Sequence, residues 1–199
     1  MPSTCLRVAT PEDAPAVAAI YDPAVRDTAI SFETAVVSAD DMRGRITRTL
    51  TRYPWLVAEA GGVVAGYAYG TQHRARAAYD WSVEVSVYLH KGARRRGLGR
   101  ALYVALLDLL AAQGYANAFA GITLPNAASV ALHEALGFAP IGVFRSVGWK
   151  MGAWRDVGWW QRTLRDDVAP AALVALADLD HGVVARALAA GAATLPAGA

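Results

Sequence analysis

A strand, a loop rich in glycine and arginine, and a helix follow one another directly in the middle of the chain, and this unit constrains the fold most. Residues Ser82–His90 alternate between apolar and polar side chains, which is typical of a strand with one buried face. Lys91–Gly99 form the loop, and Arg100–Gln113 show the spacing of a helix that ends at Gly114. The first turn of such a helix has free backbone N–H groups that can bind a ligand.

The other predicted elements surround this unit within one domain. We expect strands at Leu6–Ala9, Trp55–Ala60, Val63–Gly70, Asn117–Thr123, Ile141–Lys150 and Gly158–Leu164, and helices after Thr10, after Ser38 and at Ala127–Leu136. This order predicts an α/β (α+β) fold in which helices interrupt a largely antiparallel sheet. We expect residues 1–167 to form the domain and the alanine-rich residues 168–199 to be an appended helix or tail without a function of its own.

The composition excludes several classes of protein. Of the 199 residues, 55% are hydrophobic and 18% are charged, which excludes a disordered chain. No run of about 18 uncharged apolar residues is present, so we expect no membrane partner. The single cysteine, Cys5, excludes an internal disulfide and fits a cytoplasmic location, and we expect it to be buried and unreactive. A net charge of +2 is too small to indicate a nucleic-acid partner.

The loop has the chemistry of a phosphate site. Arg94–Arg100 (RRRGLGR) combine flexible glycines, which let the main chain approach a ligand, with guanidinium groups that pair with phosphate. The spacing is neither that of a P-loop nor that of a dinucleotide-binding fingerprint. The alternative is a basic loop that does no more than begin a helix.

The motif R-x-x-G-x-G after a strand resembles the pyrophosphate loop of the GNAT (GCN5-related N-acetyltransferase) superfamily. Asn126–Ser129 followed by Leu136–Phe138 is similar to the second motif of that superfamily. Four further blocks resemble its phosphinothricin and methionine sulfoximine/sulfone N-acetyltransferase subfamily: Arg52–Glu59 (RYPWLVAE), Ala78–Glu84 (AYDWSVE), Leu132–Gly137 (LHEALG) and Trp154–Gly158 (WRDVG). The resemblance covers about residues 5–165 and does not include the tail.

The resemblance implies a sheet of six to seven strands, flanked by about four helices, that binds acetyl-CoA where two central strands splay apart. It implies a set of coenzyme-binding residues: Val87, Tyr88 and Leu89 for the thioester and pantetheine, Arg95, Arg96, Gly97, Leu98, Gly99 and Arg100 for the pyrophosphate, and Asn126 for the pantetheine arm. No metal is required, because no His, Cys or Asp cluster has the spacing of metal ligands.

Two side chains are candidates for the proton transfers. Glu84 lies on the strand that leads to the loop, and the resemblance assigns its position the role of the base that deprotonates the amine. The alternative is an ordinary solvent-facing carboxylate. His133 stands where most of the superfamily has a tyrosine that protonates the departing thiolate. An imidazole at this place could assist the base, serve the leaving group or be structural.

The acceptor end of the site is indicated by cationic and aromatic residues. Arg74 and Arg76 precede Glu84 and suit a carboxylate or phosphinate, and the resemblance adds the ring of Tyr79. We expect Phe32 and Tyr103 to complete the wall. The other histidines, His73, His90 and His181, have no evident partner in the sequence and are expected at the surface.

The leading hypothesis is direct acetyl transfer from acetyl-CoA to the amine of a small molecule such as phosphinothricin, methionine sulfoximine or methionine sulfone. One alternative is an acetyltransferase for peptide or protein amines, and another is a non-catalytic acyl-CoA-binding module. A nucleic-acid binder fits least, because the basic residues form one loop rather than a stripe. The resemblance also implies a homodimer. The tryptophan-rich Gly148–Trp160 segment suits an apolar contact between the subunits, and the alternative is that it belongs to the core.

Overall fold

A computed structural model describes residues 4–166, 169–170 and 172–196. Within these residues the chain forms seven strands: β1 (Thr4–Val8), β2 (Trp55–Ala60), β3 (Val63–Gln72), β4 (Ser82–Leu89), β5 (Asn117–Leu124), β6 (Ala139–Lys150) and β7 (Ala153–Thr163). The α-helices of the same residues are α1 (Ala14–Arg26), α2 (Ala39–Leu50), α3 (Leu98–Ala112), α4 (Ala127–Ala135) and α5 (His181–Ala192). No helix in the described ranges is long and apolar enough to cross a membrane.

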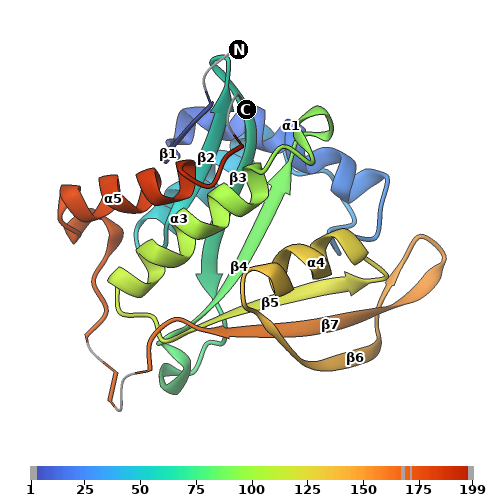
Figure 1. Cartoon of the computed structure of the whole chain (residues 1–199). Helices are drawn as coiled ribbons and strands as arrows, with labels where there is room; N and C mark the ends of the chain where they lie inside the picture. Colours follow the sequence, from blue (N-terminus) through green and yellow to red (C-terminus); the bar gives the residue numbers. More distant parts are fainter. Residues whose placement is uncertain (1–3, 167–168, 171, 197–199) are drawn as a thin grey trace.

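The strands form one sheet in the order β1-β2-β3-β4-β5-β7-β6. Neighbouring strands are antiparallel except β4 and β5, which are parallel. These two strands pair only from Ser82–Asn117 to Glu84–Phe119 and then diverge, as Figure 1 shows. The mixed, largely antiparallel sheet that the sequence predicted is therefore present, and it splays at its centre.

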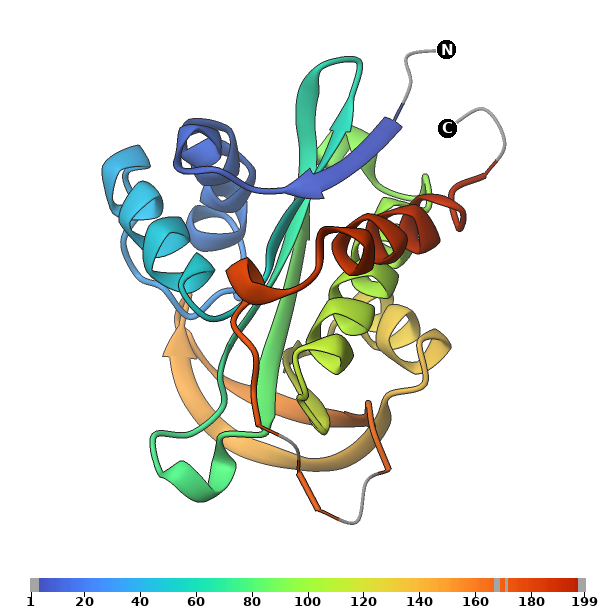
Figure 2. The same cartoon turned by 90° about the vertical axis from the view of Figure 1, so that its left-hand side faces the viewer.

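Helices cover both faces of the sheet (Figure 2). On one face α1 and α2 pack over β2 and β3 through a core that includes Ile46, Trp55 and Tyr67. On the other face the apolar side of α3 packs on Val83 and Val85 of β4. Because successive strand residues point to opposite faces, Glu84 and Tyr88 lie on the α1–α2 side. The edge-on contact of Tyr88 with Tyr21 of α1, 4.9 Å between ring centroids, agrees with this placement.

Local signals explain most of the element boundaries. Ser38 begins α2 because its side chain accepts a hydrogen bond of 3.0 Å from the Asp41 N–H. Gly61 and Gly62 both have positive φ, 62° and 78°, and make the turn between β2 and β3. These boundaries confirm the sequence-based expectation.

Other boundaries differ from the expectation. Helix α3 begins at Leu98 rather than Arg100, because Gly97, at φ 81°, supplies the left-handed residue that starts it. Strands β6 and β7 are longer than predicted and meet at Met151–Gly152, where both residues have positive φ. Trp154 and its neighbours thus belong to β7, which begins at Ala153 rather than at the predicted Gly158.

The alanine-rich segment contains a 3₁₀ turn at Leu176–Asp178 and helix α5, which packs against α3 and β1. Gly191 lies at the closest point of this contact: a Cβ there would come 2.8 Å from the Ala105 Cβ and 2.9 Å from Leu6 Cδ1. The alanine-rich segment therefore contains a helix, and this helix packs against α3, which follows the glycine loop.

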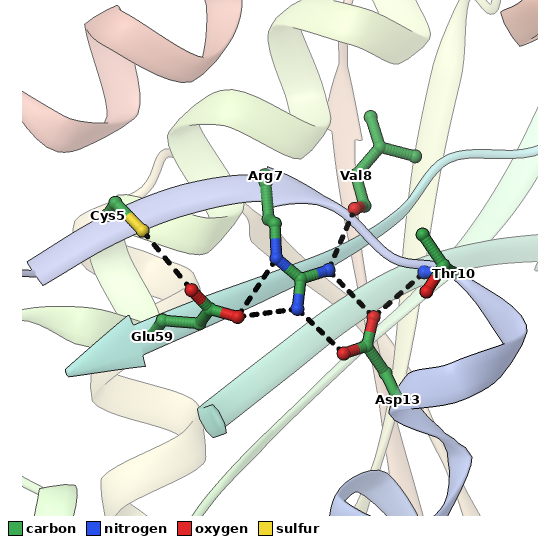
Figure 3. A network of polar contacts seen from close by, with 6 residues as sticks. All are labelled: Cys5, Arg7, Val8, Thr10, Asp13 and Glu59. Carbon is green, nitrogen blue, oxygen red and sulfur yellow. Dashed lines mark hydrogen bonds and ion pairs between the residues drawn. The ribbon is translucent and has the colours of Figure 1, made fainter. Parts of the chain in front are cut away.

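Arg7 connects β1 to β2 and to the start of α1 (Figure 3). Its two terminal nitrogens donate bonds of 2.7 Å to both carboxylate oxygens of Asp13, and its Nε donates to Glu59 at 3.0 Å. Hydrogen bonds from Arg7 hold the pKa of Asp13 below its usual value. Cys5 lies beside this network and is exposed, so the expectation that it is buried was wrong. The pKa of its thiol is raised by partial burial and by Glu59, which disfavours the reactive thiolate.

We expect Arg7→Leu to lower the free energy of unfolding at pH 7 by about 2 kcal/mol, because it leaves Asp13 buried without its partner. The matched control is Arg43→Leu, which removes an exposed pair with Asp40 and is expected to cost about 0.5 kcal/mol or less. Since the pKa of Asp13 is depressed in the folded state, its contribution is complete above the unfolded pKa and is lost as the pH falls through the folded pKa. In urea titrations, the difference in the free energy of unfolding between wild type and Arg7→Leu should become smaller as the pH falls. An equal loss of the free energy of unfolding in Arg7→Leu and Arg43→Leu would contradict this role of Arg7.

Candidate active site

Glu84 stands where the two central strands begin to separate. Its cross-strand neighbours are Thr71 on β3 and Phe119 on β5, and the pair with Phe119 is the last before the splay. The strand pattern that predicted a buried apolar face therefore places this carboxylate on the opposite face, beside the opening. The position suits a base that meets an acceptor entering from the α1–α2 side of the sheet.

The environment of Glu84 shifts its proton affinity. The side chain is 31% exposed, and burial raises the pKa of its carboxyl group. A hydrogen bond and charge from His73, together with the more distant charge of Arg74, act in the opposite direction on this pKa. A carboxylate that binds a proton more readily than usual is better matched to accepting one from an ammonium group.

The structure corrects the expectation that His73 is a surface residue without a partner. Its Nδ1 lies 3.0 Å from Oε1 of Glu84, and its side chain is only 10% exposed. The imidazole stacks on Phe119 at 4.3 Å between centroids and meets Tyr79 edge-on. The antiparallel register of β3 and β4 places His73 next to Glu84, but the long connection between the two strands hides that register in the sequence.

A cavity of about 160 Å³ lies beside this pair. It is lined by His73, Arg74, Phe119, Ile141, Gly142, Phe144 and Trp159. The guanidinium of Arg74 lies over the Trp159 ring at 5.9 Å, which places a cation at a largely aromatic wall. Arg74 thus borders the cavity and its charge acts on Glu84, and Tyr79 contacts the ring of His73. Phe119 and Trp159 were missed, because the sequence does not show that β5 and β7 pair here.

A second cavity, of about 210 Å³, lies on the same face of the sheet between α2 and the strands. Its wall includes Tyr21, Arg45, Trp55, Tyr69 and Thr71. Thr71 is the cross-strand neighbour of Glu84, so the cavity begins one residue from the candidate base.

Two residues expected in the acceptor wall lie apart from the His73 cavity. Arg76 is exposed, and among the described residues its guanidinium makes no hydrogen bond or ion pair, although its carbonyl accepts a bond of 2.9 Å from the Tyr79 N–H. Phe32 lies in the α1–α2 connection and packs against Gly148 of β6, leaving no space for a Cβ there. Lys150 fixes this connection, because its ammonium donates bonds of 2.6 Å and 2.7 Å to the carbonyls of Val25 and Ser31.

Tyr103 and His133 form a buried pair on the α3–α4 side of the sheet. The Tyr103 hydroxyl lies 3.0 Å from His133 Nε2, and His133 Nδ1 lies 2.7 Å from the Ser129 carbonyl. A carbonyl only accepts, so Nδ1 carries a proton, and the neutral ring accepts at Nε2 from Tyr103. Burial lowers the pKa of His133 and raises that of Tyr103. Tyr103 is fully buried and is not brought into the acceptor wall.

This arrangement separates His133 from Glu84, since the two lie on opposite faces of the sheet. A direct contact in which His133 assists Glu84 is absent from the described residues. The geometry favours a role on the coenzyme side, where Tyr103 and His133 share one hydrogen bond.

The glycine loop presents unpaired donors. Among the described residues, the backbone N–H groups of residues 95–97 make no hydrogen bond, and the first turn of α3 adds more free N–H groups. Arg95 adopts φ 60° and Gly97 φ 81°, so the main chain turns sharply before the helix. Arg95, Arg96 and Arg100 are exposed, whereas Leu98 is buried and Gly99 lies against Leu132 of α4. The dipole of the helix and the charge of the arginines both favour an anion at such a turn.

The C-terminal segment reaches this loop. Leu195 and Pro196 follow α5, and a Cβ on Gly97 would lie 2.8 Å from Pro196 Cδ. The segment that we expected to have no function of its own therefore lies, at Pro196, beside Gly97 of the glycine loop.

The splay leaves one edge of β4 unpaired next to the loop. Val87, Tyr88 and Leu89 pair with β3 on one side, but β5 no longer pairs with them on the other. Asn126 begins α4, where its side chain accepts a bond of 3.2 Å from the Ser129 N–H. The opening therefore offers backbone donors and acceptors along β4, with the glycine loop beyond its end.

Comparison with known proteins decides the family. The sequence profile described as "Acetyltransferase (GNAT) domain" matches residues 6–159. The chain belongs to the GNAT acetyltransferase family. It is 45% identical over 157 residues to the phosphinothricin N-acetyltransferase of Streptomyces viridochromogenes, covering 79% of this chain and 86% of that protein. Its identity to the L-methionine sulfoximine/L-methionine sulfone acetyltransferase of Salmonella typhimurium is 38% over 166 residues, or 83% and 97% of the two chains.

The solved structures agree. The GNAT phosphinothricin acetyltransferase of Sinorhizobium meliloti, in complex with acetyl-CoA, superposes with a TM-score of 0.81 at 34% identity, covering 84% of this chain and 93% of that one. The GNAT chain is therefore an acetyltransferase with the fold that the sequence predicted, and the predicted subfamily resemblance is confirmed.

Proposed function

We propose that this GNAT enzyme transfers the acetyl group of acetyl-CoA directly to the amino group of a small amino-acid-like molecule, with phosphinothricin, methionine sulfoximine and methionine sulfone as candidates. The observation that carries the proposal is the position of Glu84, at the splay of β4 and β5, beside a cavity that bears Arg74. The names of the relatives from Streptomyces viridochromogenes and Salmonella typhimurium support this choice of acceptors.

The residues around the opening fit acetyl-CoA, which would supply the acetyl thioester. The free N–H groups at residues 95–97 and the exposed Arg95, Arg96 and Arg100 match a pyrophosphate, which carries charge and several acceptor oxygens. The unpaired edge of Val87–Leu89 can hold amide groups as a neighbouring strand would, and Asn126, at the start of α4, is the further candidate for contact with the pantetheine arm. These assignments rest on the free donors and on the resemblance of the motif.

Glu84 would remove a proton from the ammonium form of the acceptor. Most of a small α-amine arrives as ammonium at pH 7, because such amines titrate near pH 8 or above. The carboxylate accepts one proton from nitrogen, directly or through water, and the neutral amine then attacks the thioester carbonyl. Arg74 would hold an acidic group of the acceptor, and Arg76 lies two residues further along the same exposed segment.

Tyr103 and His133 would act on the coenzyme side of the opening, where the thiolate departs. The Tyr103 hydroxyl donates to His133 Nε2, so the pair holds one movable proton between two heavy atoms 3.0 Å apart. That proton is available to a departing thiolate only if the hydroxyl or the ring turns toward the coenzyme.

The function is tested by steady-state thiol release with phosphinothricin, methionine sulfoximine, methionine sulfone, a set of free amino acids and peptides with free N-termini. We expect the highest kcat/KM with acceptors that carry a second acidic or sulfone-like group. Turnover of peptides without turnover of any free amino acid would overturn the proposal and favour a peptide-modifying enzyme.

We also propose a homodimer through the outer face of β6 and β7. The β6–β7 hairpin exposes Val143, Val147, Trp149, Met151 and Trp154, whereas its other exposed apolar residues, Ile141 and Phe144, line the 160 Å³ cavity. Trp149 and Trp154 are 59% and 61% exposed and contact each other edge-on. An apolar patch at a sheet edge is a common contact between copies of a chain.

The dimer predicts an effect of surface substitution. We expect the double substitution Trp149→Ser and Trp154→Ser to shift the protein from dimer to monomer in sedimentation-velocity runs at about 10 μM, because it removes the largest apolar area of the face. Val63→Ser is the control, since Val63 is 68% exposed at the β2–β3 turn and should leave the dimer intact. A wild-type protein that sediments as a monomer would contradict the proposal.

We also propose the bounds of the acetyltransferase domain and the location of the protein in the cell. We place the acetyltransferase domain at residues 1–167 and an appended segment at 168–199, supported by the profile match to residues 6–159. A cytoplasmic location is supported by the single cysteine, which leaves no internal disulfide to form.

A further inference from the structure

We propose that His73 is a positioning residue for Glu84: its Nδ1–H fixes one carboxylate oxygen and keeps the group ionised, so that the other oxygen receives the proton of the amine. This inference rests on the proposed role of Glu84 as the base. It concerns a residue that the sequence pattern left at the surface and that the structure places against the carboxylate.

The geometry gives His73 one orientation. A carboxylate has only acceptors, so the 3.0 Å contact between His73 Nδ1 and Glu84 Oε1 requires a proton on Nδ1. The ring is parallel to Phe119 within 10° at 4.3 Å, and Trp159 meets it edge-on at 6.1 Å. These two rings come from β5 and β7, so the imidazole is held by two strands on the far side of the splay. A side chain fixed in this way can hold the carboxylate without a further loss of its own rotamer freedom.

The charges around the pair explain why such a partner is needed. Burial disfavours the charged form of Glu84 and raises its pKa, which by itself would leave the base partly protonated. The other groups that face the pair are few: Arg74 and Tyr79 come from the segment after β3, and β5 and β7 contribute only rings that do not titrate. Among these, the hydrogen bond from His73 has the largest effect that favours the carboxylate.

The hydrogen bond also gives the two carboxylate oxygens different roles. Oε1 is occupied by the imidazole, which leaves Oε2 to face the acceptor. When the ammonium binds, its N–H bond breaks, an O–H bond forms at Oε2, and the positive charge of the ammonium is neutralised by the negative charge of the carboxylate. The Nδ1–H bond of His73 is kept throughout. His73 Nε2 has no hydrogen-bond partner within the described residues, and the ring borders the 160 Å³ cavity.

Two substitutions separate the hydrogen bond from the stacking. His73→Phe keeps a ring on Phe119 and removes the donor, whereas His73→Asn keeps a donor near the position of Nδ1 and removes the ring. We expect His73→Phe to move the acidic limb of the kcat/KM profile for methionine sulfone upward by about one pH unit. Below that limb kcat/KM falls about tenfold, while the plateau at high pH and the KM for acetyl-CoA change little. His73→Asn should keep the limb near its wild-type position.

The control is His181→Phe, the same change at an exposed histidine at the start of α5, which should leave the profile unchanged. Should the phenylalanine at position 73 prevent folding, His73→Leu carries the same expectation. The inference is overturned if His73→Phe or His73→Leu folds and keeps the acidic limb of the kcat/KM profile at its wild-type position. It is also overturned if the limb shifts only in His73→Asn. If Glu84→Gln removes activity but His73→Phe has no effect, only this inference fails. If Glu84→Gln is fully active, the role of Glu84 and this inference fail together.

Discussion

Glu84→Gln is expected to lower kcat/KM for methionine sulfone by about 10²–10⁴-fold at pH 7, because the amide cannot accept the proton of the ammonium. The substitution keeps the size and polarity of the side chain and leaves one oxygen as an acceptor. The deficit should shrink as the pH rises above the pKa of the substrate amine, since the acceptor then arrives without the extra proton. The acidic limb of the profile, which reports the carboxyl group, should be absent from the variant. Initial rates from pH 6 to 10 measure both effects.

The control for this prediction is Glu134→Gln on α4. Glu134 is exposed, its carboxylate accepts a bond of 3.2 Å from Trp160 Nε1, and a glutamine oxygen can accept the same bond. Its kcat/KM is expected to stay within about twofold of wild type. Equal profiles for the two variants would show that Glu84 is not the base, and a solvent-facing strand carboxylate would then be the better description.

Gly97→Val is expected to raise the KM for acetyl-CoA by about 10–100-fold with much less effect on the KM of the amine, because the substitution alters the glycine loop that we propose binds the pyrophosphate. Gly97 has φ 81°, a conformation that a β-branched residue rarely adopts. An added Cβ would also come 2.8 Å from Pro196 Cδ, so the loop or the C-terminal segment has to move. The measurement is the KM for acetyl-CoA at saturating amine, together with the Kd from calorimetry.

Gly92→Ala is the matched control in the same loop. Its φ is not in the left-handed region, and the nearest atom to an added Cβ is His90 Nδ1 at 3.5 Å, which is ordinary contact. A KM for acetyl-CoA near the wild-type value is expected. If Gly97→Val binds acetyl-CoA as tightly as Gly92→Ala does, the glycine loop is no coenzyme site.

The sequence predicted those parts of the site that depend on local structure. The glycine loop was recognisable because strand, loop and helix are continuous in residues 82–113, and the alternation of β4 predicted the face on which Glu84 lies. Both signals are physical consequences of neighbouring residues, namely period-two burial and the free N–H groups of a first helical turn. The role of Glu84 as the base came from the resemblance and stays a prediction.

The sequence did not predict the parts that depend on strand pairing. His73 meets Glu84 only through the register of β3 and β4, and Trp159 reaches Arg74 only because β7 adds to β5. These contacts join segments that are far apart along the chain, and no residue pattern marks them. The C-terminal segment is a similar case, since its alanine-rich composition predicts a helix but not that Pro196 lies beside Gly97.

The central claim, direct transfer from acetyl-CoA to a small amine, is tested most directly by initial rates with acetyl-CoA and methionine sulfone both varied and the N-acetyl product identified by mass. Direct transfer predicts intersecting double-reciprocal lines, product only when both substrates are present, and no mass increase of the protein with acetyl-CoA alone. Parallel lines with an acetylated protein would contradict direct transfer, and thiol release without an N-acetyl product would contradict the acceptor.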